Sequence, residues 1–366
     1  MTGRRVSSVA KQKWRANMRI YGLICRGLLL AASALLASTM TTTTAFAAEG
    51  PFHVEHTWQI GGEGGWDYIA IDPQSDLLYI TRGDHVQVIN REKGKLVADI
   101  TGLHGTHGVV FAPGGNGYIS DGGGNQVAVF DRKTHKVIRT IPAGTNPDGI
   151  LYEPVTRTVW AFNGRSHNVT VIDTKDDKVL ATLALPGKPE FPVADGKGNV
   201  YDNIEDKSEI VYFDAKSRKL LATWPVAPCE SPSGLAIDRA HGILFSVCDN
   251  QKMAVVSTAT GQVIATPTIG EGPDAARFSK DGGYALSSNG ESGTLTVVHE
   301  DSPQHFIVVQ NLPTEKGART LTLSPDGSKV YLVTAKFGPR PAAAQDQPHS
   351  RAPIIPGSFA VIVVGK

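Results

Sequence analysis

Ionisable side chains recur at nearly constant intervals along this sequence. Similar short segments are centred on seven positions, six of which carry a titratable or charged group: Asp67, His107, Asp148, Glu190, Ser233, Asp274 and Arg319. The intervals between these positions are 40, 41, 42, 43, 41 and 45 residues. If the tertiary structure brings them together, four carboxylates, one imidazole and one guanidinium converge. Such a set shifts pKa values and attracts cations.

The residue types in this set predict a ligand site with a divalent metal ion as the candidate cofactor. Imidazole and carboxylate groups suit divalent cations, which makes His107, Asp148 and Glu190 the candidate metal ligands. Arg319 offers a fixed cationic fork for an anionic group. The predicted ligand-binding residues are Asp67, Arg82, His107, Asp148, Glu190, Asp274 and Arg319. The alternative is that each polar residue only caps its own turn.

The repeat length indicates which elements position these residues. A period near 41 residues is typical of a propeller blade with four short strands. In the third repeat, alternating and β-branched residues predict strands at 149–152, 158–162, 168–172 and 178–183, with Gly, Pro, Asp and Asn between them. The sequence therefore predicts an all-β fold, a seven-bladed β-propeller with four antiparallel strands per blade.

Two segments lie outside the regular repeats. Residues 54–60 precede the first repeat, and we expect them to pair with the last blade and so remove its open edge. Residues 339–356 interrupt the last repeat between its second and third strands and are rich in Pro and Ala. We expect this loop to form a mobile lid over the end of the channel that the ionisable residues surround, here called the top mouth.

The two faces of the predicted disc differ in composition. The start of each innermost strand and the turn between the second and third strands share the top face, where the ionisable residues gather. The other turns share the bottom face and contain ordinary turn residues. His135, His241 and His305 fall in bottom turns or outer segments, where we expect solvated side chains.

Short motifs within the repeats resemble a known family. Degenerate YVTN sequences occur at Tyr79-Ile80-Thr81-Arg82, Tyr118-Ile119-Ser120 and Tyr331-Leu332-Val333-Thr334. On these motifs the chain resembles the YncE-like, YVTN-repeat propellers of bacterial envelopes. The resemblance implies the fold and a periplasmic location, but it implies no activity, because propellers host unrelated functions.

The N-terminus has the pattern of a secretory signal peptide. The apolar run 28–36 follows basic residues and precedes Ala45-Phe46-Ala47, a small-x-small cleavage signal. We expect residues 1–47 to be removed and residues 48–366 to form a single propeller domain in the periplasm. The alternative is a membrane anchor, but the run is short for a span, and no later segment is long and apolar enough to cross a bilayer.

Net charge and cysteine content narrow the possible classes of protein further. Residues 1–47 hold seven of the 36 basic residues and none of the 35 acidic ones, which leaves residues 48–366 with a net charge of −6. An acidic chain is not expected to bind nucleic acid, which requires Lys and Arg at phosphates. Residues 48–366 contain two cysteines, Cys229 and Cys248, which we expect to form a disulfide at the top face.

The motifs of several enzyme classes are missing. The sequence contains no GxSxG, HExxH, CxxCH or Walker motif. We expect a monomeric propeller that binds a small molecule, a metal or an envelope protein at the top mouth. The alternatives are a metal-assisted, lactonase-like hydrolase that uses the same pocket, and an interaction scaffold that uses the rim of the disc.

Overall fold

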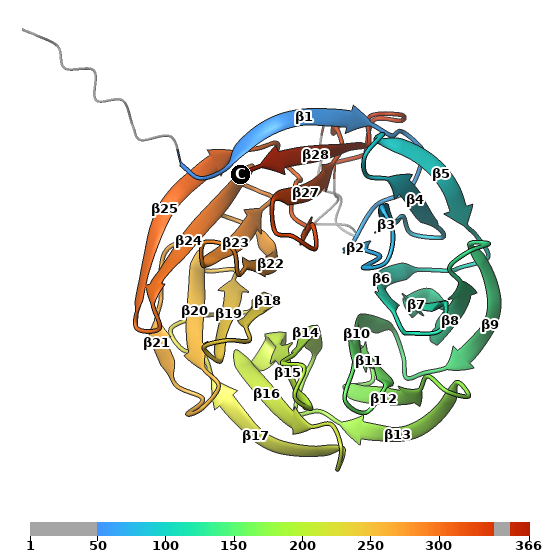
Figure 1. Ribbon diagram of the computed structural model, residues 1–366, viewed down its shortest axis with the longest axis horizontal. Coiled ribbons are helices and arrows are strands. Elements are labelled where there is room, and N and C mark those ends of the chain that lie inside the picture. The colour runs from blue at the N-terminus through green and yellow to red at the C-terminus, as the bar shows by residue number, and fades with distance from the viewer. Residues whose placement is uncertain (1–49, 340–351) are drawn as a thin grey trace, which may run out of the picture. The chain divides into compact units, whose positions relative to one another are not determined.

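The computed structural model describes residues 50–339 and 352–366 of the chain. These residues form seven four-stranded antiparallel sheets, which stand as blades around a central axis (Figure 1). The first strand of each blade lies nearest the axis, and the last lies at the rim. The predicted seven-bladed β-propeller is confirmed.

In the first six blades the chain runs outward, from the innermost strand to the rim. Blades one to three comprise β2 (Ile69–Ile71), β3 (Leu77–Thr81), β4 (Val86–Asn90), β5 (Lys95–Ile100), β6 (Thr106–Phe111), β7 (Asn116–Asp121), β8 (Gln126–Asp131), β9 (Lys136–Pro142), β10 (Pro147–Glu153), β11 (Thr158–Asn163), β12 (Asn168–Asp173) and β13 (Lys178–Ala184). Blades four to six comprise β14 (Pro189–Ala194), β15 (Asn199–Ile204), β16 (Glu209–Asp214), β17 (Lys219–Pro225), β18 (Pro232–Asp238), β19 (Ile243–Cys248), β20 (Lys252–Ser257), β21 (Val263–Ala265), β22 (Pro273–Ser279), β23 (Tyr284–Asn289), β24 (Thr294–Ser302) and β25 (His305–Pro313). Two short 3-10 helices, η1 (Gly122–Gly124) and η2 (Glu205–Lys207), follow the second strands of blades two and four.

Blade seven closes the propeller with strands from both ends of the described chain. It contains β26 (Leu321–Leu323), β27 (Lys329–Thr334), β28 (Ala360–Gly365) and, outermost, β1 (His53–Gln59). β1 pairs antiparallel with β28, with Thr57 opposite Ile362. The predicted pairing of residues 54–60 with the last blade is thus confirmed, and it covers the edge of β28 and gives this blade its fourth strand.

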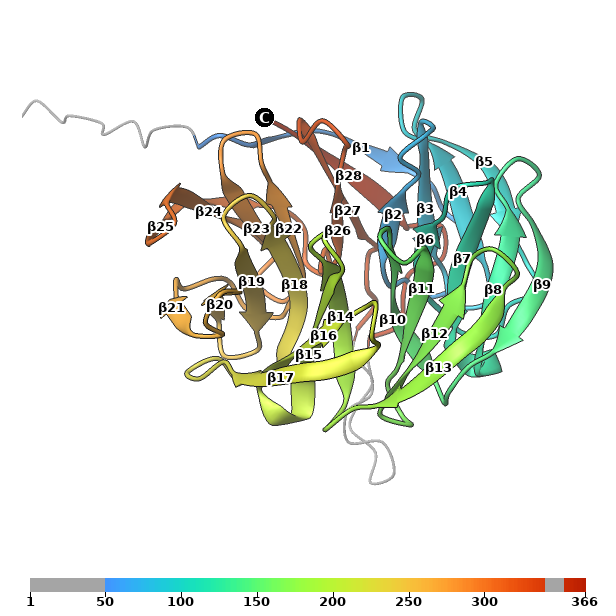
Figure 2. The ribbon, with the colours of Figure 1, turned by 60° about the horizontal axis from the view of Figure 1, so that its bottom comes forward.

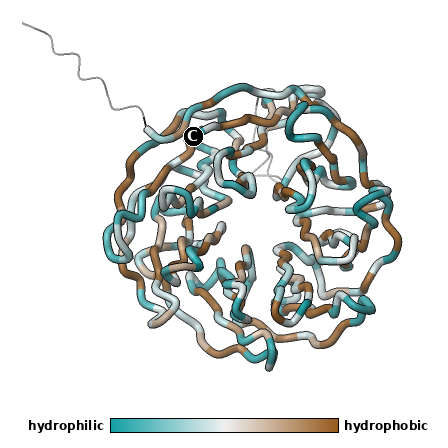
Figure 3. Tube along the Cα trace, in the orientation of Figure 1, coloured by the Kyte–Doolittle hydropathy of each residue, from teal (hydrophilic) through white to brown (hydrophobic). Residues whose placement is uncertain are grey.

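The hydrophobic core is divided among the interfaces between neighbouring blades. Seven clusters of buried residues occupy these interfaces. Between blades three and four, for example, Trp160 packs edge-on against Phe213 with ring centroids 5.6 Å apart. Figure 3 shows hydrophobic and hydrophilic residues interspersed along the strands, as sheets with two different faces require.

The innermost strands present their first residues to the axis through irregular backbone. In blades two to six the pairing register shifts near the start of the strand, for example between Pro147 and Ile150. Such β-bulges re-aim a side chain. Proline is the first residue of four of these strands, a position where its missing N–H costs no ladder bond. Figure 2 shows the innermost strands standing side by side around the axis.

Cys229 and Cys248 form a disulfide within blade five. Their Cα atoms are 5.7 Å apart, and both residues are buried. The bond ties the connection before β18 to the end of β19. The predicted pairing is confirmed.

The proposed signal peptide, residues 1–47, lies outside the described residues, as does most of the predicted lid. The roots of that loop are described: Phe337 bridges Ile354, and the N–H of Gly338 donates to the carbonyl of Pro353 at 2.8 Å. Within residues 50–339 and 352–366, no helix is long and apolar enough to cross a membrane.

Candidate ligand and metal site at the channel mouth

Buried side chains hold the backbone of the ionisable ring in place. Thr81, on β3, donates to the carbonyl of His107 in the next blade at 2.9 Å. Ser120, on β7, does the same for the carbonyl of Asp148 at 2.6 Å. Thr320 donates to the carbonyl of Asp67 at 2.9 Å, which links blade seven to blade one. Because these donors come from adjacent blades, closure of the propeller fixes the ring.

His107 lies between two carboxylates. Its Nδ1 is 2.7 Å from Oδ2 of Asp67 and 3.5 Å from Oδ1 of Asp148. One ligand atom from each of the three residues lies within 4.8 Å of the others. All three side chains are mostly buried but reach solvent. An imidazole and two carboxylates at this separation can hold a divalent cation.

The surroundings shift the pKa values of the ring strongly. Burial disfavours protonated His107, but the hydrogen bond to Asp67 and the charge of Asp148 outweigh it and raise the His107 pKa to about 9. Burial raises the pKa of Asp148 to about 7. Burial and the charge of Asp148 raise the pKa of Glu190 to about 8. The ring therefore gathers more carboxyl groups in a desolvated site than its own cations can pair with, and Asp148 and Glu190 retain protons up to near neutral pH.

Arg319 closes the ring on the side of blade seven. It forms an ion pair with Asp274, and its Nη2 is 3.8 Å from Oδ1 of Asp67. The same nitrogen donates to the carbonyl of Trp66 at 2.8 Å. Asp67 thus contacts the histidine on one side and the guanidinium on the other.

Glu190 belongs to the ring but not to the compact group around His107. Its Oε2 lies 3.2 Å from Nζ of Lys188, which also pairs with Glu205. Of the three predicted metal ligands, the structure brings His107 and Asp148 within joint reach of one ion, and the third member of that group is Asp67.

Arg82 does not face the ring. Its guanidinium is fully buried and donates to the carbonyls of Gly61, Glu63, Gly64 and Gly65 and to Gln87. Its Cζ lies 3.6 Å from the centroid of the Phe359 ring. The position of Arg82 after β3, on the top side, predicts a place at the mouth. In the structure all five of its donor contacts go instead to the loop before β2 and to Gln87.

A cavity of about 780 Å³ adjoins the ring between blades seven and one. Its lining includes Trp66, Phe337, Ile354 and Arg319, so an apolar wall ends at a guanidinium. The indole N–H of Trp66 is buried and has no hydrogen-bond partner among residues 50–339 and 352–366. The cavity joins the roots of the predicted lid to the ring, on the face that the sequence analysis assigned to both.

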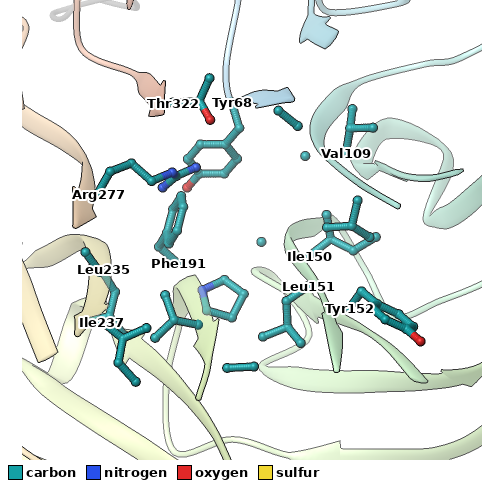
Figure 4. Close-up of a pocket in the computed structure, with 18 of the residues that line it drawn as sticks. Tyr68, Val109, Ile150, Leu151, Tyr152, Phe191, Leu235, Ile237, Arg277 and Thr322 are labelled. Atoms are coloured by element: carbon teal, nitrogen blue, oxygen red, sulfur yellow. The ribbon is translucent and has the colours of Figure 1, made fainter. Parts of the chain in front are cut away.

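Below the ring, aromatic and charged side chains meet across the channel. The rings of Tyr68 and Phe191 are 4.9 Å apart, and Cζ of Arg277 lies 4.9 Å from the Phe191 centroid (Figure 4). These residues come from blades one, four and six. They also line a second cavity of about 430 Å³, which runs along the innermost strands and includes Ile150 and Leu151.

Asp202, on β15, is a member of this region that the sequence analysis missed. It is fully buried, and neither carboxylate oxygen has a hydrogen-bond partner within the residues that the structure describes. Burial and the charges of Glu190 and Asp148 raise its pKa well above the usual value. Comparison of the repeats could have found it, because the equivalent positions of blades one and two hold Ile80 and Ile119.

We predict that Asp202→Asn makes the protein more stable at alkaline pH. A carboxyl whose native pKa is raised holds its proton in the folded state and loses it on unfolding, so stability falls as pH rises above the unfolded pKa. Asparagine removes that penalty. We expect its advantage over the parent to be near zero at about pH 4 and about 1 to 2 kcal/mol at about pH 8. Urea unfolding at both pH values checks this, and an advantage that shrinks with rising pH would contradict it.

Comparisons with known proteins agree with the propeller fold. No protein-family model matches the chain. A stretch of 50 residues is 44% identical to the PE-PGRS family protein PE_PGRS18 of Mycobacterium tuberculosis, and it covers 14% of this chain and 11% of that protein. The chain therefore spans about a tenth of the length of that relative.

Solved structures with similar folds cover almost the whole propeller. The RRP9 WD40 repeats superpose with a TM-score of 0.70 at 11% identity, covering 86% of this chain and 99% of that one. A streptogramin B lyase gives 0.65 at 13% identity, covering 85% and 97%. Hydrazine synthase of Kuenenia stuttgartiensis gives 0.64 at 15% identity, covering 83% and 99%. At these identities the likeness shows the β-propeller fold alone.

Proposed function

We propose that this protein binds a small organic anion together with a divalent cation at the top mouth of its channel. The observation that carries the proposal is the cluster of Asp67, His107 and Asp148, whose ligand atoms lie within 4.8 Å of one another. Arg319, 3.8 Å from Asp67, lines the adjoining cavity. Concave sites with a few convergent polar groups are the usual places for small ligands.

The charge balance of the ring supports the cation. Desolvated carboxylates that face one another are stabilised by a positive charge, and a dication supplies more than the single proton of His107 can. Oxygen ligands with one imidazole suit Mn²⁺ or Zn²⁺. Entry of the ion displaces that proton, since a metal-bound imidazole nitrogen must be deprotonated.

The adjoining cavity supports the organic anion. Trp66 and Phe337 supply an aromatic wall. The indole N–H of Trp66, which has no partner in the described part of the chain, offers a hydrogen bond to an acceptor. Arg319 lies between this wall and Asp67, so the acidic group of a ligand would meet the guanidinium on the side nearer the cation.

We further propose that the protein acts in the periplasm as a member of the YncE-like YVTN-repeat propellers. The Cys229–Cys248 disulfide supports an oxidising compartment, because such bonds persist outside the cytosol. The signal-peptide pattern of residues 1–47 supports export.

Binding of the cation is tested by titrating the metal-stripped His107→Ala variant. We expect isothermal titration with Mn²⁺ or Zn²⁺ to show affinity at the mouth at least about tenfold weaker than in the parent. His85→Ala is the matched control, because His85 is also on the top side but contacts its neighbour Asp84, at 2.7 Å. Unchanged affinity in His107→Ala would overturn the cation part of the proposal.

A second arm of the same experiment tests the organic anion. The probes are the fluorescent anion anilinonaphthalene sulfonate and its uncharged analogue phenylnaphthylamine. We expect the folded parent to prefer the anion and Arg319→Met to lose that preference, with the exposed Arg165→Met as the control. Equal binding of both probes to the parent would contradict the anion part of the proposal. Hydrolysis of aryl lactones by the metal-loaded parent, but not by His107→Ala, would instead favour the hydrolase alternative.

A further inference from the structure

A second group of ligand-type side chains lies on the bottom face, between blades five and six. It consists of Asp238 at the end of β18, His241 in the following turn and Glu300 on β24. The place of His241 in a bottom turn predicts a solvated side chain. In the structure its ring is half exposed, but its Nδ1 lies 2.6 Å from Oδ2 of Asp238 and 2.8 Å from Oε1 of Glu300.

The two carboxylates of this group are buried without adequate partners. Asp238 and Glu300 are 4% and 8% exposed. Oδ1 of Asp238 accepts from the N–H of Ala240 at 2.9 Å. Among the described residues, its Oδ2 and both oxygens of Glu300 lack a partner in hydrogen-bond geometry. A single Nδ1–H cannot serve two short contacts fully, so the group needs more positive charge than His241 provides.

The interface between blades one and two can be compared with this one, because the blades are repeats of one unit. Blades one and two meet at the equivalent place through Asp72 and Arg132, which form a buried ion pair. Arg132 and Glu300 occupy the same position in their blades, because each backbone N–H donates to the first turn of its own blade, at Gly115 and Gly283 respectively. Where blade two places a guanidinium against an aspartate, blade six places a second carboxylate.

Glu300 is also unusual among the remaining blades. The equivalent residues there are Arg91, Thr174, Ala215, Thr258 and Lys366, none of which is acidic. A carboxylate that faces a buried aspartate is therefore a departure from the repeat. Like charges in a desolvated interface destabilise each other unless one carboxyl holds a proton or a cation lies between them.

We propose that Asp238, His241 and Glu300 bind a divalent transition-metal cation, Mn²⁺ or Zn²⁺, that links blades five and six. One imidazole and two carboxylates suit these ions, and the ligand atoms lie within 4.8 Å of one another. The ion takes the place that the guanidinium of Arg132 has between blades one and two. The exposed side of His241 leaves room for entry and for water ligands.

The test compares two substitutions of Glu300 in metal-stripped protein. We expect Mn²⁺ or Zn²⁺ to raise the melting temperature of the parent. Glu300→Gln should bind the ion at this site at least about tenfold more weakly. Glu300→Arg introduces between blades five and six the same Asp–Arg pairing that blades one and two have. We therefore expect this variant to lose the metal site, and yet its melting temperature without metal should be at least that of the metal-free parent.

Controls separate this site from the one at the channel mouth. His305→Ala removes an exposed histidine from the same hairpin, where it lies 3.2 Å from Asp301, and should leave metal binding unchanged. His107→Ala should lose the mouth site and keep this one, whereas Glu300→Gln should do the reverse. Metal binding in Glu300→Gln and Glu300→Arg equal to that of the parent would overturn the proposal, whatever the mouth site does.

Discussion

Replacement of Arg82 by methionine is expected to lower the free energy of unfolding by about 4 kcal/mol. Arg82 is fully buried, and its guanidinium donates hydrogen bonds to the carbonyls of four residues between 61 and 65. Methionine keeps much of the packing against Phe359 but donates nothing. The loop must then turn its carbonyls to water, which loses charge-assisted hydrogen bonds and the order of the segment that precedes Asp67.

Urea unfolding followed by tryptophan fluorescence measures this loss. Arg82→Lys is an informative companion, because lysine keeps the charge but lacks the planar fork and cannot reach the same set of carbonyls. We expect it to recover less than half of the lost stability. Arg165→Met, at an exposed turn, should change stability by no more than about 0.5 kcal/mol. If Arg82→Met is as stable as that control, Arg82 does not hold the loop.

Replacement of both Cys229 and Cys248 by alanine is expected to cost about 3 kcal/mol. The bond closes a loop with a sequence separation of 19, so its removal restores chain entropy to the unfolded state. Alanine is used because a serine hydroxyl at these buried positions would add a desolvation penalty of its own.

Chemical reduction provides the control for the disulfide. A reductant should bring the stability of the parent close to that of the double alanine variant and should leave the variant itself unchanged. Two free thiols per molecule in unreduced, unfolded protein of residues 48–366 would show that the bond is not formed in solution, and the expected loss would then not occur.

The large-scale architecture could be predicted from the sequence because it follows from a repeat. Strand alternation and turn residues recur in every blade, so each blade supports the same prediction, and errors at single positions do not accumulate. The pairing of residues 54–60 with the last blade followed from the cost of an open edge. The Cys229–Cys248 bond followed from the antiparallel course of two neighbouring strands and the small number of cysteines.

Part of the ring could also be predicted, because a side chain at the start of an innermost strand must lie near the axis. The repeat alone placed His107, Asp148 and Arg319 around one mouth. It could not tell which neighbours come within reach of one another, because that depends on the bulge and rotamer of each strand. Asp67 rather than Glu190 completes the group around His107, whereas Glu190 forms an ion pair with Lys188.

Tertiary structure alone decided the roles of Arg82 and Glu300, and it supplied the environment of Asp202, which differs from its equivalents in blades one and two already in the sequence. A charged residue next to a turn has the same sequence signature whether it meets water, a loop or another carboxylate. Its environment is supplied by residues that are distant in the chain or lie in the adjacent blade: the 61–65 loop for Arg82, the channel acids for Asp202, and blade five for Glu300. The period of the sequence determined the blades, and the contacts between blades determined where uncompensated charge is buried.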